Sequence, residues 1–148
     1  MLIGLGNVVG SYVASALGDK YRRKYLLSIL YMLRAIAILG LVVLPASAPV
    51  SLAFGLIMGL LWLGTVPLTT SLVAQIFGTR YMTTLFGIVY FTHQIGAALG
   101  VYLGGRIFDG TGSYDLVWMI AAGLGVLAAL LHWPIADKPL RTAQPAGA

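Results

Sequence analysis

The sequence predicts an all-α membrane protein with five transmembrane helices. Of its 148 residues, 59% are hydrophobic and only 9% are charged, whereas an ordinary soluble domain has about 25% charged residues. The apolar residues form five long runs, and one helical crossing of a bilayer needs about 20 such residues. The basic residues behind the net charge of +5 fall at the ends of these runs. This pattern excludes a basic face for nucleic acid and indicates that the lipid bilayer surrounds the chain.

The expected helix bundle covers residues 1–136, with spans at residues 2–17, 25–44, 50–77, 82–108 and 116–135. We expect residues 137–148 to form a short disordered tail. No basic residue precedes the first run, which favours a retained helix over a cleavable signal peptide. Small residues recur at every fourth position of this span, at Gly6, Gly10, Ala14 and Gly18. They share one helical face, where a neighbouring helix can approach closely.

Polar residues interrupt the next three spans. Arg34 stands near the middle of the second span, where a charge is costly unless it faces protein or water. Pro67 lies inside the third span, so we expect a kink near residues 65–67, with Thr65 and Thr69 on one face beside it. The fourth span holds His93 and Gln94.

A second small-residue stripe, Gly96, Gly100 and Gly104, follows His93 at the same spacing of four. His93 shares this face, which predicts that the face packs against protein rather than lipid. The fifth span contains no strongly polar residue before His132, and Trp118 and Trp133 are expected as interfacial anchors. We interpret this span as structural support.

The loops between the spans predict the orientation of the chain in the membrane. Alternate crossings place seven basic residues on one side, against Arg106 alone on the other. The seven are Lys20, Arg22, Arg23, Lys24, Arg80, Lys138 and Arg141. Cytoplasmic loops carry an excess of Lys and Arg. The amino terminus is therefore expected outside and the carboxyl terminus in the cytoplasm, most simply in a plasma membrane such as the bacterial inner membrane.

The densest charge cluster resembles the loop motif of the major facilitator superfamily. The motif positions are Ser15, Asp19, Lys20, Arg23 and Lys24, although the family usually has Gly where this chain has Ser15. Further resemblance lies at residues 66–69, 76–78, 86–88, 93–100 and 109–114. Together these motifs resemble the carboxyl-terminal half of such a transporter, in the monocarboxylate-transporter-like or oxalate/formate-antiporter-like branch.

This resemblance implies that the five spans correspond to the last five of twelve helices. The amino-terminal half and the seventh helix would then be missing from the chain. The resemblance also implies that the Pro67 helix lines the transport cavity, and that the loop motif braces the cytoplasmic helix ends and controls their opening. The alternative for the Asp19 and Arg23 cluster is a solvated group of charges that only sets topology.

Each polar residue within a span has two interpretations. Arg34 could form an anion site or a structural contact with carbonyls or Tyr31, and the structural contact is favoured. His93 could be a proton relay or a neutral helix contact; Gln94 and Asn7 are weaker candidates of the same kind. Thr65 and Thr69 could contact a substrate or cover the backbone gap left by Pro67.

The first functional hypothesis is a partial secondary transporter that moves a small solute, favoured as an organic carboxylate, by alternating access. The second is a non-transporting membrane subunit or remnant that packs against a partner helix bundle. An enzyme is disfavoured, because the sequence contains no nucleophile beside a base, no paired carboxylates, no metal-ligand spacing and no cysteine. No cofactor is expected.

Overall fold

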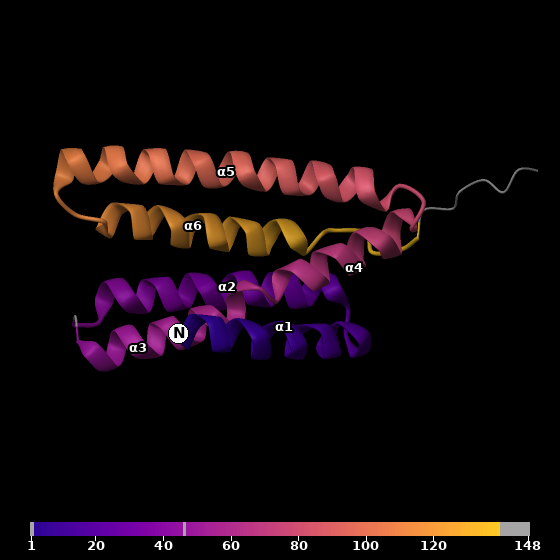
Figure 1. The fold of residues 1–148 in the computed structure, drawn as a ribbon, viewed down its shortest axis with the longest axis horizontal. Helices are drawn as coiled ribbons and strands as arrows, with labels where there is room; N and C mark the ends of the chain where they lie inside the picture. The colour runs from indigo at the N-terminus through magenta and orange to yellow at the C-terminus, as the bar shows by residue number, and fades with distance from the viewer. Residues whose placement is uncertain (1, 46, 140–148) are drawn as a thin grey trace, which may run out of the picture.

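The computed structural model describes residues 2–45 and 47–139, and these residues form helices, turns and short irregular segments without a strand. The helices are α1 (Leu2–Lys20), α2 (Arg23–Val43), α3 (Ala48–Trp62), α4 (Thr65–Phe77), α5 (Met82–Thr111) and α6 (Asp115–His132). Since α4 continues α3 after a short break, the elements form five rods that run back and forth along the long axis (Figure 1). The predicted all-α class is confirmed.

Four rods within the described chain are long and apolar enough to cross a membrane: residues 23–43, 48–77, 82–111 and 115–132. Helix α1 is 19 residues long but is not among these four. One face of α1 is buried, because its small residues lie against α3 and α4. The chain is therefore an integral membrane protein with five rods, and α1 is the most polar of them.

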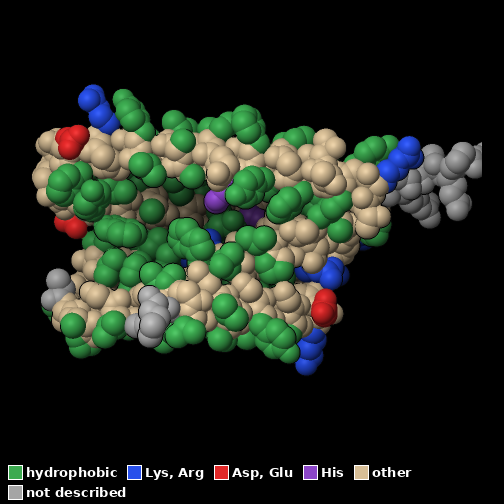
Figure 2. All heavy atoms as spheres, in the orientation of Figure 1, with side chains coloured by type: hydrophobic (Ala, Val, Ile, Leu, Met, Phe, Trp, Pro, Cys, Tyr) green, Lys and Arg blue, Asp and Glu red, His purple; other side chains and the backbone are tan. Residues whose placement is uncertain are grey.

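The loops divide the charges as the sequence predicted. The turns at residues 21–22 and 78–81 and the segment after α6 lie at one end of the bundle, and the turns near residues 45 and 112–114 lie at the other (Figure 1). Lys and Arg side chains gather at the first of these ends (Figure 2). Residues 140–148 of the expected tail, including Arg141, lie outside the described residues.

The small-residue stripe of α1 packs directly on the α3–α4 rod, as predicted. Gly6, Gly10, Ala14 and Gly18 are all buried. A Cβ atom on Gly6 would lie 3.0 Å from the Leu60 backbone nitrogen, and one on Gly10 would overlap the Leu60 carbonyl oxygen. The two backbones can approach this closely only because glycine has no side chain.

Several element boundaries differ from the expected spans, and α6 ends at His132 rather than at residue 135. The third span is not one kinked helix but two helices, separated at Leu63 and Gly64. Pro67 supplies no N–H for the Leu63 carbonyl four residues earlier, so the break lies one turn before the proline. Helix α5 continues to Thr111, beyond the expected end of its span at residue 108, and it is capped by Gly112 with φ of 70°. Helix α1 continues through Asp19 to Lys20.

Helix α5 is the exposed part of the bundle. Only Gly104 of its 30 residues is buried, and it lies next to Val117 of α6. Gly96 and Gly100 have no atom within 4 Å of the position of a Cβ. The prediction that the His93 face packs against protein is therefore wrong for most of this face in the described chain, because another helix covers it only at Gly104.

Candidate functional site

The first polar group of interest lies at the break between α3 and α4. The Arg34 guanidinium of α2 donates hydrogen bonds from Nε and Nη2 to the Leu61 carbonyl, at 3.1 and 2.5 Å. Nη2 also donates to the Trp62 carbonyl at 2.5 Å and to Thr65 Oγ1 at 3.3 Å. Arg34 is thus held by the carbonyl end of α3, where a cation is favoured by the helix dipole.

Aromatic rings flank the same guanidinium. Its central carbon lies 5.3 Å from the ring centroids of both Tyr31 and Trp62. Tyr31 in turn stacks on His132 of α6, with 5.1 Å between the ring centroids. Neither ion pair found among the described residues involves Arg34. Its charge is therefore stabilised by carbonyl dipoles and π faces in place of a carboxylate.

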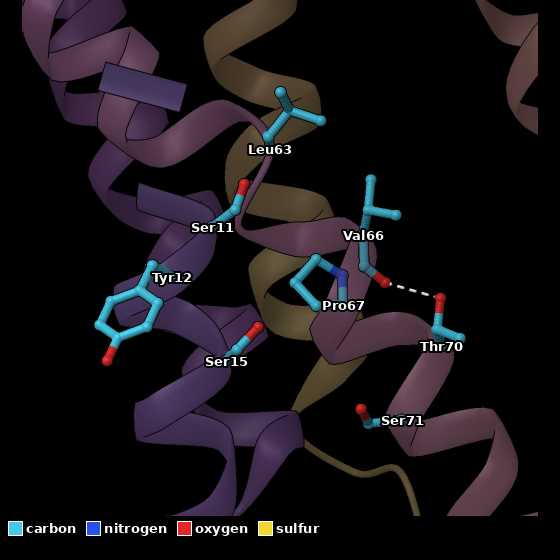
Figure 3. A pocket seen from close by; sticks show the side chains of 8 residues that line it. All are labelled: Ser11, Tyr12, Ser15, Leu63, Val66, Pro67, Thr70 and Ser71. Carbon is cyan, nitrogen blue, oxygen red and sulfur yellow. Dashed lines mark hydrogen bonds between the residues drawn. The ribbon is translucent and has the colours of Figure 1, made fainter. Parts of the chain in front are cut away.

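A groove of about 550 Å³ lies beside the break, between α1 and α4. Its walls carry five hydroxyl groups among apolar residues (Figure 3). The lining residues are Ser11, Tyr12, Ser15, Leu63, Val66, Pro67, Thr70 and Ser71.

Two of the groove hydroxyls already have backbone partners. Ser11 donates to the Asn7 carbonyl at 2.7 Å, and Thr70 donates to the Val66 carbonyl at 2.8 Å. The hydroxyls of Ser15 and Ser71 extend from opposite walls of the groove (Figure 3). Such a surface can offer hydroxyl donors and acceptors to a small polar solute, but it contributes no formal charge.

A polar network closes the basic end of the bundle. Arg23 lies 3.8 Å from Asp19 and donates to Gln75 Oε1 of α4 at 2.6 Å. Gln75 donates to the Asp137 carbonyl at 2.8 Å. Lys24, which is 9% exposed, donates to the Ile135 carbonyl at 2.8 Å. The network therefore ties α1, α2 and α4 to the segment after α6.

The structure brings some predicted site residues together and leaves others apart. Arg34 and Thr65 meet at the break, and Pro67 lines the groove next to it. Asp19, Arg23 and Lys24 belong to the end network, whereas Ser15 faces the groove and Lys20 lies over the Tyr21 ring. These positions divide the loop motif between two sites.

The remaining candidates lie away from both sites. His93 and Gln94 are exposed on α5, where the nearest aromatic neighbour of His93 is Tyr90 on the same helix. Thr69 is half-buried on α4 and does not line the groove, where Thr70 and Ser71 take its place. Asn7 Oδ1 is buried without a hydrogen-bond partner among the described residues.

Sequence reasoning missed several residues of these sites. Ser11 precedes Ser15 by one helical turn, so this spacing of four could have indicated a hydroxyl face on α1. Gln75 and Asp137 could not be paired with the loop motif from sequence alone. Gln75 is 52 residues from Arg23, and no pattern in the sequence connects these positions.

Comparison with known proteins decides the family. The family model described as "Major Facilitator Superfamily" matches residues 1–148 of the chain. This chain belongs to the major facilitator superfamily. The resemblance predicted from the sequence motifs is thereby confirmed.

Three curated relatives illustrate the similarity. The chain is 31% identical over 141 residues to the uncharacterized MFS-type transporter YcxA of Bacillus subtilis (strain 168), covering 90% of this chain and 33% of the relative. It is 32% identical to mouse (Mus musculus) protein spinster homolog 1, covering 91% of this chain and 27% of the relative. It is 27% identical to rat (Rattus norvegicus) monocarboxylate transporter 12, covering 97% and 31%. The chain thus spans about a third or less of the length of these relatives. No solved structure matches the chain.

Proposed function

We propose that this chain is part of a secondary transporter that moves a small solute by alternating access, and that it is not an enzyme. The observation that carries the proposal is the break in the α3–α4 rod beside a groove with five hydroxyls. Interrupted helices at mid-membrane are where transporters of many folds place their substrate sites. Family membership supports the same function, because the relatives named as transporters share this stretch of chain.

The proposed solute is an organic carboxylate. Support comes from the similarity to a protein named monocarboxylate transporter 12 and from the motifs that resemble this branch. Hydroxyl groups such as those of Ser15 and Ser71 can donate to carboxylate oxygens. Thr65 and Thr69 remain proposed contacts, and Thr65 is already bonded to the Trp62 carbonyl at 3.1 Å. Gln94 and Asn7 are weaker candidates for the solute path.

The polar network at the basic end is proposed as the cytoplasmic gate. Its hydrogen bonds join α2 and α4 to the segment after α6, and the Asp19–Arg23 ion pair adds α1, so any separation of these elements must break them. The excess of Lys and Arg at this end supports a cytoplasmic location, with the amino terminus outside, in the plasma membrane. His93 is proposed as a proton relay, since an exposed histidine on a spanning helix needs a polar partner or water.

A second function is favoured by the exposed helix α5. Its 30 residues bury only Gly104 against the rest of the described chain. The missing amino-terminal half of a transporter, or another helix bundle, would cover this surface. A chain that packs on such a partner without moving solute itself would be a membrane subunit or remnant.

Transport by reconstituted protein tests the first function. The purified chain is placed in liposomes, alone and together with the product of any adjacent reading frame that encodes about seven further spans. Uptake of radiolabelled lactate, formate and oxalate is then measured. We expect uptake of at least one carboxylate by the complete assembly, and reduced uptake when Ser71→Ala is introduced. Absence of uptake of all three by every assembly would contradict the carboxylate transporter and favour the subunit.

The proposed orientation has its own test. The chain contains no cysteine, so a single cysteine introduced by Arg22→Cys is the only thiol. We expect an impermeant thiol reagent to label it in inside-out vesicles and not from outside intact cells. Labelling from outside would contradict the proposed topology.

A further inference from the structure

The break between α3 and α4 is unusual because its backbone is nearly helical. Leu63 has φ of −79° and ψ of −14°, and Gly64 has φ of −60° and ψ of −21°. Both residues lie in or near the right-handed helical region. Small torsional changes would therefore convert the break into a continuous helix or into a different bend, so the backbone torsions alone do not fix the angle between α3 and α4.

Arg34 is the side chain that occupies the break. Its Nε and Nη2 atoms bridge the Leu61 and Trp62 carbonyls, and Nη2 reaches Thr65 Oγ1 at the first residue of α4. In lipid, carbonyl groups released from a helix must find donors within the protein. One guanidinium therefore joins the last turn of α3 to the start of α4, with Nη2 contacting both sides of the break and Nε adding a second bond to the Leu61 carbonyl.

The groove is built on the same hinge. Leu63, Val66 and Pro67 of the break form part of its wall, and Ser11 and Ser15 of α1 face them. Helix α1 is fixed to α3 by backbone contacts at Gly6 and Gly10. A change in the bend would thus move α4 relative to α1 and alter the width of the groove.

We propose that Arg34 is a positioning residue that sets the bend between α3 and α4, and through this bend the width of the hydroxyl-lined groove. Its Nε and Nη2 atoms are already bonded to the backbone and to Thr65, so it acts through α4 rather than by binding the solute. The consequence for solute movement rests on the proposed transport function. The effect on the bend does not, and can be measured without any solute.

The test measures the position of α4 in the purified chain. The exposed residues Ala16 of α1 and Phe77 at the end of α4 are replaced by Ala16→Cys and Phe77→Cys and carry spin labels. The absence of natural cysteines makes the labelling specific. Helix α4 is about 20 Å long, so a small change in bend displaces its far end by several ångströms. The distance between the labels is determined in lipid nanodiscs by pulsed electron paramagnetic resonance.

We expect one narrow distance distribution in the parent protein. Arg34→Met keeps much of the side-chain volume but removes the hydrogen-bond donors. It should shift or broaden the distance distribution by about 5 Å, because a change of about 15° in the angle between α3 and α4 moves the far end of α4 by about that distance. Arg34→Lys retains the charge without the fork and should give an intermediate distribution. Arg106→Met removes an exposed arginine on α5 and serves as the matched control, with no shift.

A parent-like distribution in Arg34→Met would overturn the proposal, whether or not thermal stability falls, because it would show that Arg34 only adds packing energy. If Arg34→Met does not fold, Thr65→Val tests the contact to α4 alone and should broaden the distribution to a smaller degree. A parent-like distribution in both Thr65→Val and Arg34→Lys would then overturn it. Failure of carboxylate uptake with a shifted bend would instead contradict only the proposed transport function.

Discussion

Two stripes of small residues have the same spacing but opposite surroundings. The α1 stripe, defined as Gly6, Gly10, Ala14 and Gly18, is buried at every position. The α5 stripe, defined as Gly96, Gly100 and Gly104, is buried only at Gly104. The difference lies in what faces each stripe, since α3 presents its own glycine, Gly59, to α1. A stripe of small residues therefore marks a close contact only where a second helix lies against it.

The α2–α6 contact shows the same rule with a wider separation. A Cβ atom on Gly125 would lie 3.3 Å from Ala35 Cβ and 3.4 Å from the Tyr31 carbonyl oxygen. Ser28 adds a buried hydrogen bond to the Ala129 carbonyl at 2.7 Å. Glycine-to-alanine substitutions at different positions can therefore rank the tightness of the three surfaces on one scale.

The largest effect is expected for Gly10→Ala. The new methyl group would overlap the Leu60 carbonyl oxygen, and α1 would have to move away from α3. Overpacking of this kind costs about 1–3 kcal/mol or more, which outweighs the gain of up to about 1 kcal/mol in helix propensity. The free energy of unfolding, measured by titration with SDS in mixed micelles, should fall by about 2 kcal/mol.

Gly4→Ala is the matched control for this substitution. It lies on the same helix, and no atom comes within 4 Å of the position of its Cβ. An equal loss of stability in both variants would show that the burial of the α1 stripe does not determine the effect, and the comparison between the stripes would fail.

A smaller loss is expected for Gly59→Ala on the opposite side of the same contact. Its Cβ would lie 2.7 Å from the Ile3 carbonyl oxygen, and Ile3 is close enough to the start of α1 for the helix end to shift. We expect a net loss of about 1 kcal/mol in the same titration. Gly55→Ala, whose Cβ would lie at an ordinary 3.7 Å from the Ile3 side chain, should cost less. A larger loss of stability for Gly55→Ala than for Gly59→Ala would show that α1 and α3 do not approach most closely at Gly59.

Gly125→Ala should change the unfolding free energy by no more than about 0.5 kcal/mol. Its contacts require Ala35 to yield by only a few tenths of an ångström, and the gain in helix propensity offsets that cost. Gly123→Ala on the same helix has open space and should be slightly stabilising. A loss comparable with that of Gly10→Ala would mean that α2 and α6 pack as tightly as α1 and α3.

The sequence predicted the features that depend on local patterns. Apolar runs and charged loops were sufficient for the helical class, the alternating rods and the basic end. The spacing of four was sufficient to identify the buried face of α1, because small residues at every fourth position necessarily align on a helix. The same spacing could not identify a partner for α5, since the partner surface belongs to a different element.

The candidate site depends on contacts that local patterns do not encode. Thr65 was predicted as a polar residue beside the proline, but its meeting with Arg34 joins positions 31 residues apart. The Lys24 contact with the carbonyl of Ile135 spans 111 residues. Loop-motif residues could be identified from their order, whereas their partners Gln75 and Asp137 follow only from the packing of three helix ends.

An effect of opposite sign, a gain in stability, is expected for Gly96→Ala on the α5 stripe. No atom lies within 4 Å of its Cβ position, so the methyl group is accommodated and the helix gains up to about 1 kcal/mol in propensity. The purified chain should therefore unfold at slightly higher SDS. If the proposed partner half of a transporter covers α5 in a complete assembly, the same substitution should destabilise the assembly while leaving the isolated chain intact. Equal stabilisation of both would show that this face remains open to lipid, and would remove α5 as the surface that a partner bundle needs.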